Sequence, residues 1–344
     1  MRRADPTMTR RAALGLATRG AVAAAGAGAL ARASAAVAQT PGSEAPVLSR
    51  GRTKVVVLGS HGGQQETQLT GANLRCGTSV LIDVAGELLV VDCGVGSLHR
   101  LVEAGYDANQ VRHVLVTHHH QDHTADLGNF AGFGWASGPN GGDPRRRMDL
   151  YGPTGTRAYE RGYKLLAGLS IADQEGPLGQ VPTFRAFARW HEFRPPKRGR
   201  RLLSTSRFTV HAIRVTHGGM PSVGYRVRTP DLDLVFSGDR GYGRDRFASF
   251  ARGADAMFHE IIDRELVVRT LRAQGATSGF IRHLIEDHCS PDEAGRTATA
   301  AGVETLVLYH LIPANPGITD DAWRSMVQPQ FGGRIVVSRD LQVV

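Results

Sequence analysis

Four potential metal ligands lie within six residues of the chain, in the order His118-x-His120-x-Asp122-His123. Imidazole nitrogens and carboxylate oxygens are the usual protein ligands of zinc and of its first-row neighbours. Alternate positions on an extended turn direct their side chains to the same side, so His119 is expected to point away from the ions. Because a bound divalent ion activates water at neutral pH, the chemistry that this segment predicts is metal-assisted hydrolysis.

Five further residues that can bind a metal or transfer a proton follow later in the chain. Most of them come directly after an apolar run typical of a buried strand, as an organised site would require. They are His217, Asp239, Glu260, His288 and His310. A polar loop with accidental histidines would not be followed by ligands at successive strand ends, so we interpret the set as one site.

The elements that must position these residues are those of an α/β chain. The apolar run of residues 111–116 predicts a buried strand that ends directly before the histidines. Loops that leave the carboxyl ends of strands carry the sites of layered α/β folds. We therefore expect one α/β domain over residues 54–344. Further strands are expected at residues 54–59, 79–84, 88–92, 148–152, 208–215, 223–227, 232–236, 256–260 and 305–309, and helices at 97–104, 125–135, 155–169 and 290–302.

The histidine segment resembles the HxHxDH signature of the metallo-β-lactamase superfamily. His217 is followed by a Ser-x-Gly-Tyr segment and then by Ser-Gly-Asp239, which is similar to the branch containing ribonuclease Z, phosphodiesterases and arylsulfatases. The resemblance covers residues 54–340. It implies a four-layer αββα sandwich as the form of the α/β fold.

The resemblance also implies a role for each site residue. Two divalent ions, zinc or else manganese, would share a hydroxide that attacks an ester. One ion would be bound by His118, His120 and His217, the second by Asp122, His123 and His310, and Asp239 would bridge them. The catalytic residues implied are Asp122, Glu260 and His288, of which the last two would pass a proton to the leaving group. Asp92 would support the ligands through hydrogen bonds.

The expected substrate is a small molecule or a short anionic ester, in the first place a phosphodiester. An aryl sulfate or a lactone stays open, because an activated hydroxide attacks these esters as well. True β-lactamases use Cys or His at the second ion, so the Asp122-His123 pair argues against antibiotic hydrolysis. Transfer RNA is expected to be excluded, since only 21 residues separate His217 from Asp239. That spacing leaves no room for the long arm of tRNA-processing relatives.

Residues 1–38 are expected to be a twin-arginine export signal. The pair Arg10-Arg11 precedes an Ala- and Gly-rich stretch, and Ala36-Val37-Ala38 supplies small residues for cleavage. The segment carries a net +5, so the whole-chain charge of +9 falls to +4 without it. Residues 39–53 would form a linker. We expect a periplasmic or secreted protein without a transmembrane anchor, because no run reaches the roughly 18 apolar residues of a spanning helix.

Residues 176–205 combine basic and aromatic side chains. Arginines and lysines alternate there with Phe184, Phe187, Trp190 and Phe193. Basic residues among aromatics can bind a polyanion, which leaves a non-catalytic polyanion-binding protein open as a competing function. The alternative is a solvated insertion whose aromatic side chains cover an edge of the core.

Three cysteines, Cys76, Cys93 and Cys289, lie far apart in the chain and form no CxxC pair. An odd number cannot pair completely within one chain, so we do not expect a disulfide framework. The cysteines are expected to be small buried thiols. A homodimer is left open.

Overall fold

The computed structural model describes residues 48, 51–63, 75–138, 142–243, 245–314 and 318–344. All of the described residues belong to one compact unit, Val37–Val344. The expected export signal and most of the expected linker lie outside the described residues. Among the residues described, no helix has the length and the apolar content needed to cross a bilayer.

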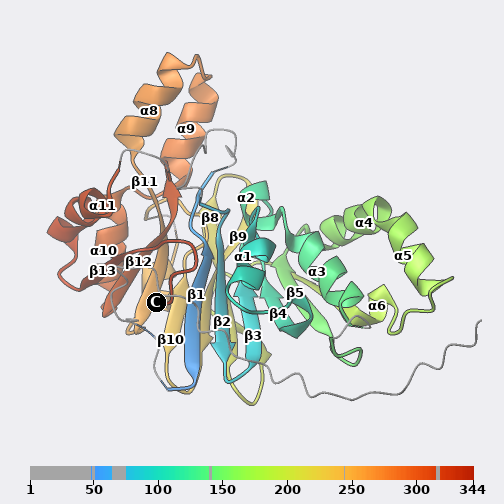
Figure 1. The fold of residues 1–344 in the computed structure, drawn as a ribbon. Helices are drawn as coiled ribbons and strands as arrows, with labels where there is room; N and C mark the ends of the chain where they lie inside the picture. Colours follow the sequence, from blue (N-terminus) through green and yellow to red (C-terminus); the bar gives the residue numbers. More distant parts are fainter. Residues whose placement is uncertain (1–47, 49–50, 64–74, 139–141, 244, 315–317) are drawn as a thin grey trace, which may run out of the picture. The chain divides into compact units, whose positions relative to one another are not determined.

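Two β-sheets form the centre of this unit (Figure 1). The first has six strands in the order β1-β2-β3-β4-β5-β6, antiparallel from β1 to β3 and parallel from β3 to β6. Its strands are β1 Thr53–Gly59, β2 Ser79–Val84, β3 Glu87–Val91, β4 Val111–Leu115, β5 Met148–Pro153 and β6 Ala188–Phe193.

The second sheet has seven strands in the order β13-β12-β11-β10-β9-β8-β7. It is antiparallel from β7 to β10 and parallel from β10 to β13. Its strands are β7 Arg200–Ser204, β8 Thr209–His217, β9 Met220–Arg228, β10 Asp233–Phe236, β11 Ala256–Ile262, β12 Thr305–Ile312 and β13 Arg334–Val337.

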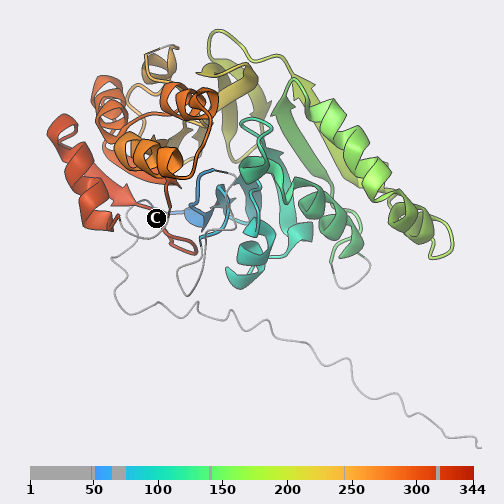
Figure 2. The ribbon, with the colours of Figure 1, turned by 90° about the horizontal axis from the view of Figure 1, so that it is seen from above.

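Helices cover the outer faces of both sheets, and a pair of helices, α8 and α9, projects from one end of the sandwich (Figures 1 and 2). Beside the first sheet are α1 Ser97–Glu103, η2 Ala108–Gln110, α2 Gln121–Thr124, α3 Leu127–Ala136, α4 Thr156–Leu166, α5 Gly168–Glu175 and α6 Phe184–Phe187. Beside the second are α7 Phe247–Phe250, α8 Arg264–Ala273, α9 Ser278–Asp287, α10 Pro291–Ala301, α11 Asp320–Val327 and η3 Gln328–Gln330.

The layers are held together by side chains that alternate in direction along the strands. In β1, Val55 and Val57 face the second sheet and share a buried cluster with Phe236 of β10. Their neighbours Val56 and Leu58 belong to another cluster, between the first sheet and its helices. A third cluster lies between the second sheet and helices α7, α10 and α11. The expected four-layer αββα sandwich is therefore confirmed.

Helix α10 begins as the sequence predicts. The Ser290 hydroxyl accepts from the Glu293 N–H (3.3 Å), and the Glu293 carboxylate accepts from the Ser290 N–H (2.9 Å). Pro291 occupies the first turn, and Gly302, with φ +63°, ends the helix. This N-terminus holds His288, two residues earlier, at the end of the sandwich where the strands finish.

The cysteines are unpaired, as expected. Cys93 and Cys289 are buried and Cys76 is half-buried. The fold is therefore stabilised by its apolar clusters and not by disulfides.

The basic and aromatic stretch supplies the last strand of each sheet, β6 and β7. Its aromatic side chains face inwards, with Phe184 and Phe187 1% exposed and Trp190 3% exposed. They belong to the cluster between the first sheet and its helices. These three aromatic residues therefore complete the core, and most of the basic residues face solvent.

Candidate metal centre

The histidine segment leaves the carboxyl end of β4 and leads into α2. The two sheets are joined at this point, because the Val223 N–H of β9 donates to the Thr117 carbonyl (3.0 Å). Gly238, with φ +56°, lies against the junction, where a Cβ would be 3.0 Å from the Cβ of Thr117. A glycine before Asp239 therefore lets the second sheet approach the histidine segment closely.

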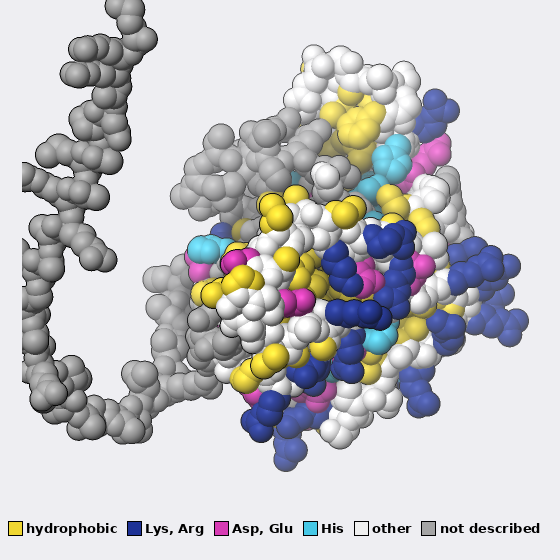
Figure 3. Space-filling model, turned by 90° about the vertical axis from the view of Figure 1, so that its right-hand side faces the viewer, with side chains coloured by type: hydrophobic (Ala, Val, Ile, Leu, Met, Phe, Trp, Pro, Cys, Tyr) yellow, Lys and Arg dark blue, Asp and Glu magenta, His cyan; other side chains and the backbone are white. Residues whose placement is uncertain are grey.

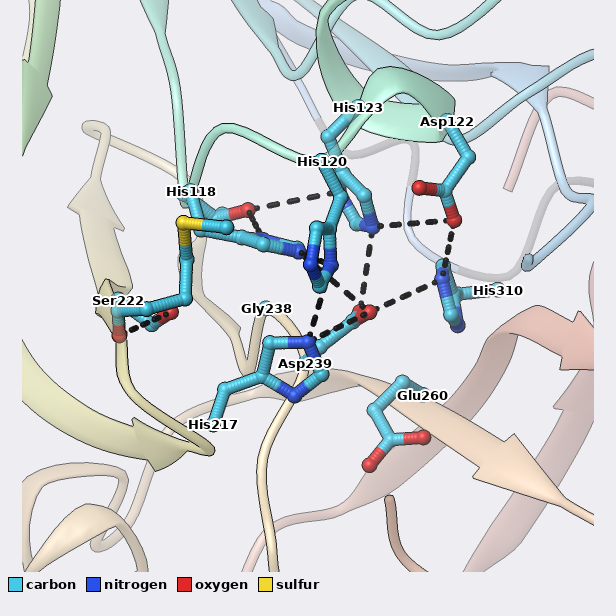
Figure 4. Close-up of polar contacts among 12 residues, drawn as sticks. His118, His120, Asp122, His123, His217, Ser222, Gly238, Asp239, Glu260 and His310 are labelled. Atoms are coloured by element: carbon cyan, nitrogen blue, oxygen red, sulfur yellow. Dashed lines mark hydrogen bonds and ion pairs between the residues drawn. The ribbon is translucent and has the colours of Figure 1, made fainter. Parts of the chain in front are cut away.

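Four of the expected ligands form a first group. The His118 Nε2 lies 3.0 Å from the His120 Nδ1, and the His217 Nε2 lies 3.1 Å from the same atom. The Asp239 Oδ2 is 3.6 Å from the His118 Nε2 and 3.8 Å from the His217 Nε2 (Figure 4). All four ligand atoms lie within 4.8 Å of one another.

The other expected ligands form a second group around the same aspartate. The His310 Nε2 lies 3.1 Å from the Asp122 Oδ2 and 3.2 Å from the Asp239 Oδ2. The His123 Nε2 lies 3.2 Å from the Asp239 Oδ1 and 3.7 Å from the Asp122 Oδ2. The structure thus brings together all seven of the expected ligands, with Asp239 in both groups.

Hydrogen bonds around the site fix the orientation of the imidazoles. The His123 Nδ1 donates to the Asp92 Oδ2 (2.9 Å), and Asp92 also accepts from the Thr117 N–H and hydroxyl (2.7 and 2.8 Å). The His217 Nδ1 donates to the Asp287 carbonyl (2.9 Å). In both histidines this leaves the Nε2 lone pair directed at the site. The support expected from Asp92 is therefore present.

Several inward-facing atoms of the site have no hydrogen bond. The Asp122 Oδ1, the His123 Nε2 and the Asp239 Oδ1 are buried and form no regular hydrogen bond, although the last two lie 3.2 Å apart as an ion pair. Buried polar atoms are normally satisfied, because leaving them unpaired is costly. Clustered nitrogen and carboxylate atoms in this state match the ligand preferences of zinc-like divalent ions. The residues present therefore fit two such ions.

Burial and neighbouring charges together set the protonation of several ligands. It lowers the pKa of His118 well below its usual value and that of His217 to about 4, so both imidazoles are neutral. Burial disfavours the charge of Asp122, but the neighbouring histidines, led by His123, outweigh it and lower the pKa of this carboxyl. Burial also opposes the charge of His123, yet the carboxylates, led by Asp239, raise its pKa well above the usual value. A metal ion would displace this proton, since ligands bind in the deprotonated form.

The expected proton-transfer pair lies beside the two groups that share Asp239, and together with His310 it forms a further potential ligand group. The His288 Nδ1 is 3.3 Å from the Glu260 Oε2 and 3.9 Å from the Asp239 Oδ2. Burial disfavours the charge of His288, but Glu260 overcomes this and raises the pKa of His288 to about 9. The other Glu260 oxygen accepts from the Cys289 N–H (2.7 Å). His288 is therefore held protonated next to the aspartate that both groups share.

His119 points away from the site, as the alternation predicts. Its Nε2 contacts the Thr156 hydroxyl (3.1 Å), and its ring stacks on Tyr159. It belongs to none of the groups of potential metal ligands among the described residues. His119 therefore serves as a control for the neighbouring histidines.

Sequence reasoning missed His283, which lies at the site. Its ring centroid is 5.6 Å from that of His217 and 6.1 Å from that of His120. Its Nδ1 donates to the Asp287 carboxylate (2.8 Å), and its side chain is 38% exposed. The spacing of four residues to Asp287 would have indicated a shared helix face, had residues 278–287 been recognised as a helix.

Arg240 was also missed, although it directly follows Asp239. Its buried guanidinium forms two hydrogen bonds with the Asp245 carboxylate (2.9 and 3.1 Å) and donates to the His259 Nε2 (3.2 Å). The Cys289 thiol donates to the Arg240 carbonyl (3.3 Å). Arg240 thus contacts the residue before Glu260 and the residue after His288. This network connects the three chain segments that carry the shared aspartate and the proton-transfer pair.

Replacing Arg240 with Met is expected to lower the free energy of unfolding by about 3–5 kcal/mol, because Asp245 would remain as an unpaired buried charge. Zinc affinity is expected to fall by about 10- to 100-fold, the usual effect of removing a residue that orients ligands. The control is Arg240→Met with Asp245→Asn, which should recover stability but leave zinc binding weak. Denaturant unfolding and zinc titration measure both effects. Recovery of zinc affinity in the double variant would show that Arg240 does not position the site.

Comparisons with known proteins agree with the fold and with the arrangement of the seven ligands. The family model described as the beta-lactamase superfamily domain matches residues 88–311. Ribonuclease Z of Mycolicibacterium gilvum (strain PYR-GCK) is 31% identical over 281 residues, covering 78% of this chain and 90% of that protein. The metallo-β-lactamase fold protein YhfI from Bacillus subtilis has a TM-score of 0.59 at 24% identity, covering 85% of this chain and 98% of that one. The short form of human tRNase Z has a TM-score of 0.59 at 16% identity, with coverages of 85% and 98%.

These relatives correct one expectation, since the exclusion of tRNA is wrong. It rested on the short stretch between His217 and Asp239, which the structure forms from strands β9 and β10 without a projecting arm. A ribonuclease Z nevertheless aligns over most of the chain, and a tRNase Z shares the fold. The short stretch therefore does not separate this chain from its ribonuclease Z relatives. Family match, relatives and fold together show that the chain belongs to the metallo-β-lactamase superfamily and is a metal-dependent hydrolase that acts on ester bonds.

Proposed function

We propose that the protein is a dinuclear zinc hydrolase that cleaves a phosphodiester. The observation that carries this proposal is the position of Asp239, whose two oxygens lie 3.2 to 3.8 Å from ligand atoms of both groups. One carboxylate in that position can hold two ions a few ångströms apart. A pair of divalent ions, when bound, lowers the pKa of a water molecule and so supplies a nucleophile near neutral pH.

The side chains of the chain itself would perform the remaining steps. Asp122 would bind an ion through one oxygen and keep its position through the Gly63 N–H, which donates to its Oδ2 (2.8 Å). His288, protonated and held by Glu260, would give its proton to the departing oxygen. His283, at the exposed side of the site, would contact the substrate.

Zinc is proposed because the set contains five imidazoles and two carboxylates. Imidazole suits zinc and its neighbours, whereas magnesium and calcium prefer sites made of oxygen alone. Manganese is the alternative, because carboxylates also suit it. Turnover per bound ion, compared between the zinc-loaded and the manganese-loaded protein, would identify the metal that the site uses.

A phosphodiester is proposed over an aryl sulfate because of the acid pair. An alkoxide is a poor leaving group and needs a proton as it departs, whereas a phenolate leaves with little help. His288, with its pKa raised to about 9, is protonated at neutral pH and can supply that proton. This arrangement is therefore more useful for an ester with an alkyl or ribosyl leaving group.

The test is a panel of esters assayed with the zinc-loaded and the manganese-loaded protein. We expect hydrolysis of bis-p-nitrophenyl phosphate and of an alkyl phosphodiester, and much weaker hydrolysis of p-nitrophenyl sulfate and of an acyl lactone. Faster hydrolysis of the sulfate or of the lactone would show that the proposed phosphodiester substrate is wrong. No hydrolysis of any ester by protein with bound metal would favour a non-catalytic polyanion-binding protein.

We also propose that the protein is exported by the twin-arginine route, with residues 54–344 as the hydrolase domain. Replacing Arg10 and Arg11 with Lys is expected to leave the chain in the cytoplasm with an uncleaved N-terminus, because the pathway recognises the paired guanidinium groups. Cell fractionation and N-terminal sequencing measure this result. Replacement of Arg2 and Arg3 with Lys is the matched control and should leave export intact. Normal export of the Arg10/Arg11 variant would refute the proposal.

A further inference from the structure

Positive charge is concentrated in one stretch of the folded chain, residues 156–207. This stretch carries eleven Lys and Arg against four Asp and Glu, a net +7. The whole chain carries +9, of which +5 lies in residues 1–38, so residues 39–155 and 208–344 together carry −3. The excess of positive charge in the folded chain therefore comes entirely from the segment that runs from α4 to the loop after β7.

The same stretch contains the most exposed large apolar side chains among the described residues. Five side chains between residues 165 and 181 are 70–91% exposed, whereas no other large apolar side chain that the structure describes exceeds 60%. They are Leu165, Leu166, Leu169, Leu178 and Val181. Single exposed apolar residues are common, but a group of this kind marks an interaction surface.

Helix α4 directs its apolar residues in two directions. Tyr159 and Tyr163 pack against the core beneath the helix. Leu165 and Leu166 are 85% exposed, and Leu169, at the start of α5, is 91% exposed. The core is therefore already covered by the tyrosines, and the leucines have no partner within the described chain.

The basic and apolar side chains lie on one side of the molecule. Helix α4 contacts both α5 and β6, and α6 also contacts β6. The Glu192 carboxylate of β6 accepts from the Gly155 and Arg157 N–H groups at the start of α4 (2.9 Å each). Figure 3 views this side and shows Lys and Arg side chains gathered beside apolar ones. We call the surface formed by α4, α5, α6, β6 and the loop that follows β6, residues 194–199, the basic face.

We propose that the basic face binds an anionic phospholipid surface. Leucines at the junction of α4 and α5 would enter the interface, and the arginines beside them would contact lipid phosphates. Arg161, Arg185 and Arg198 are exposed and form no ion pair with any described residue, so their charge is free to act. Exposed apolar side chains next to unpaired positive charge are the combination that surface-bound proteins use. This proposal is independent of the chemistry at the metal centre.

Two other partners fit the basic face less well. A single-stranded nucleic acid would need exposed aromatic rings for its bases, yet Phe184, Phe187 and Trp190 are at most 3% exposed. A second copy of the chain, joined by a two-fold axis, would bring the same net positive segment against itself, which costs free energy. An anionic membrane satisfies the leucines and the arginines together.

The proposal can be tested by sedimentation with vesicles of phosphatidylglycerol and phosphatidylcholine. The full chain is expected to bind mixed vesicles at least 100-fold more tightly than phosphatidylcholine alone, and less tightly as salt rises. The triple variant Arg161→Gln/Arg185→Gln/Arg198→Gln should weaken vesicle binding by about 100-fold, because each lost charge weakens it by about fivefold. Leu165→Ser/Leu166→Ser/Leu169→Ser should weaken it by about tenfold or more.

The matched control removes three exposed charges elsewhere, with Arg252→Gln/Arg269→Gln/Arg272→Gln. It has the same net charge as the basic-face variant and should bind vesicles almost as tightly as the unchanged protein. Hydrolysis of a soluble ester should be the same in all three variants, which shows that each is folded. The proposal fails if the control loses as much binding as the basic-face variant or if the unchanged protein does not bind anionic vesicles. It also fails if the leucine variant binds as before, or if the leucine substitutions only convert a dimer into a monomer.

Discussion

Asp239→Ala is expected to lose at least one of two zinc ions and to lower kcat/KM by at least about 10³-fold, equivalent to about 4 kcal/mol of transition-state stabilisation. Asp239 is the only residue that belongs to both ligand groups among the described residues. Its removal would also take from the His123 Nε2 the carboxylate oxygen closest to that atom, the Asp239 Oδ1 at 3.2 Å. Metal analysis by mass spectrometry and steady-state kinetics measure the two losses.

The control for this prediction is His119→Ala. The two residues belong to the same end of the sandwich, but His119 contacts Thr156 and Tyr159 outside the ligand groups. This variant should retain both ions and most of the activity. If Asp239→Ala kept two ions and full activity, the bridging assignment would be wrong.

His288→Ala is expected to lower turnover of an alkyl phosphodiester by about 10²- to 10⁴-fold while the metal content stays unchanged. His288 contacts Glu260 and belongs to neither of the two four-residue ligand groups that share Asp239. The defect should be much smaller for a p-nitrophenyl ester, because p-nitrophenolate departs with little need for a proton. When the logarithm of turnover is plotted against the pKa of the leaving group, the line should therefore be steeper for the variant than for the unchanged protein.

Glu260→Gln provides a second measure of the same assignment. It removes the carboxylate that raises the pKa of His288 but keeps a side chain of the same shape. The loss of turnover in Glu260→Gln should also grow with the pKa of the leaving group, but it should be smaller than the loss in His288→Ala. An equal defect for both kinds of ester, or the loss of an ion from His288→Ala, would mean that His288 positions or binds metal and is not the acid.

The local pattern of the sequence was sufficient to predict the ligand segment and the strands that end at it. The run before His118 was recognised as a strand, and β4 spans Val111–Leu115. His217, Asp239 and His310 each follow an apolar run, the family resemblance predicts them as ligands, and the structure brings them together. Strand ends are easy to locate because alternation and β-branched residues mark them. The αββα layers followed from the family resemblance and not from periodicity.

Prediction failed where the local pattern was ambiguous. Residues 155–169 were expected to form one helix, but the structure divides them into α4 and α5 at Ala167 and Gly168, since glycine weakens a helix interior. Helices α8 and α9 were not predicted at all, and with them the position of His283 was missed. The edge strands β6 and β7 were hidden by their many charges, because an edge strand is exposed on one side.

Long-range contacts could not be read from the sequence. The pairing of Arg240 with Asp245 and the contact with His259 depend on how β10, β11 and the segment before α10 meet in space. A buried arginine looks like any surface arginine in a sequence with 41 Lys and Arg. Only the fold shows that this guanidinium has no access to solvent.

Zinc titration of the metal-stripped protein, with hydrolysis of bis-p-nitrophenyl phosphate as the readout, tests the central claim most directly. If Asp239 joins two ions in one catalytic centre, activity should be almost absent without metal and should rise until about two equivalents per chain are bound, as expected for two-metal hydrolases. The measured zinc content should reach two at the same point. Full activity in the stripped protein, or a plateau of activity at one equivalent, would contradict the dinuclear account.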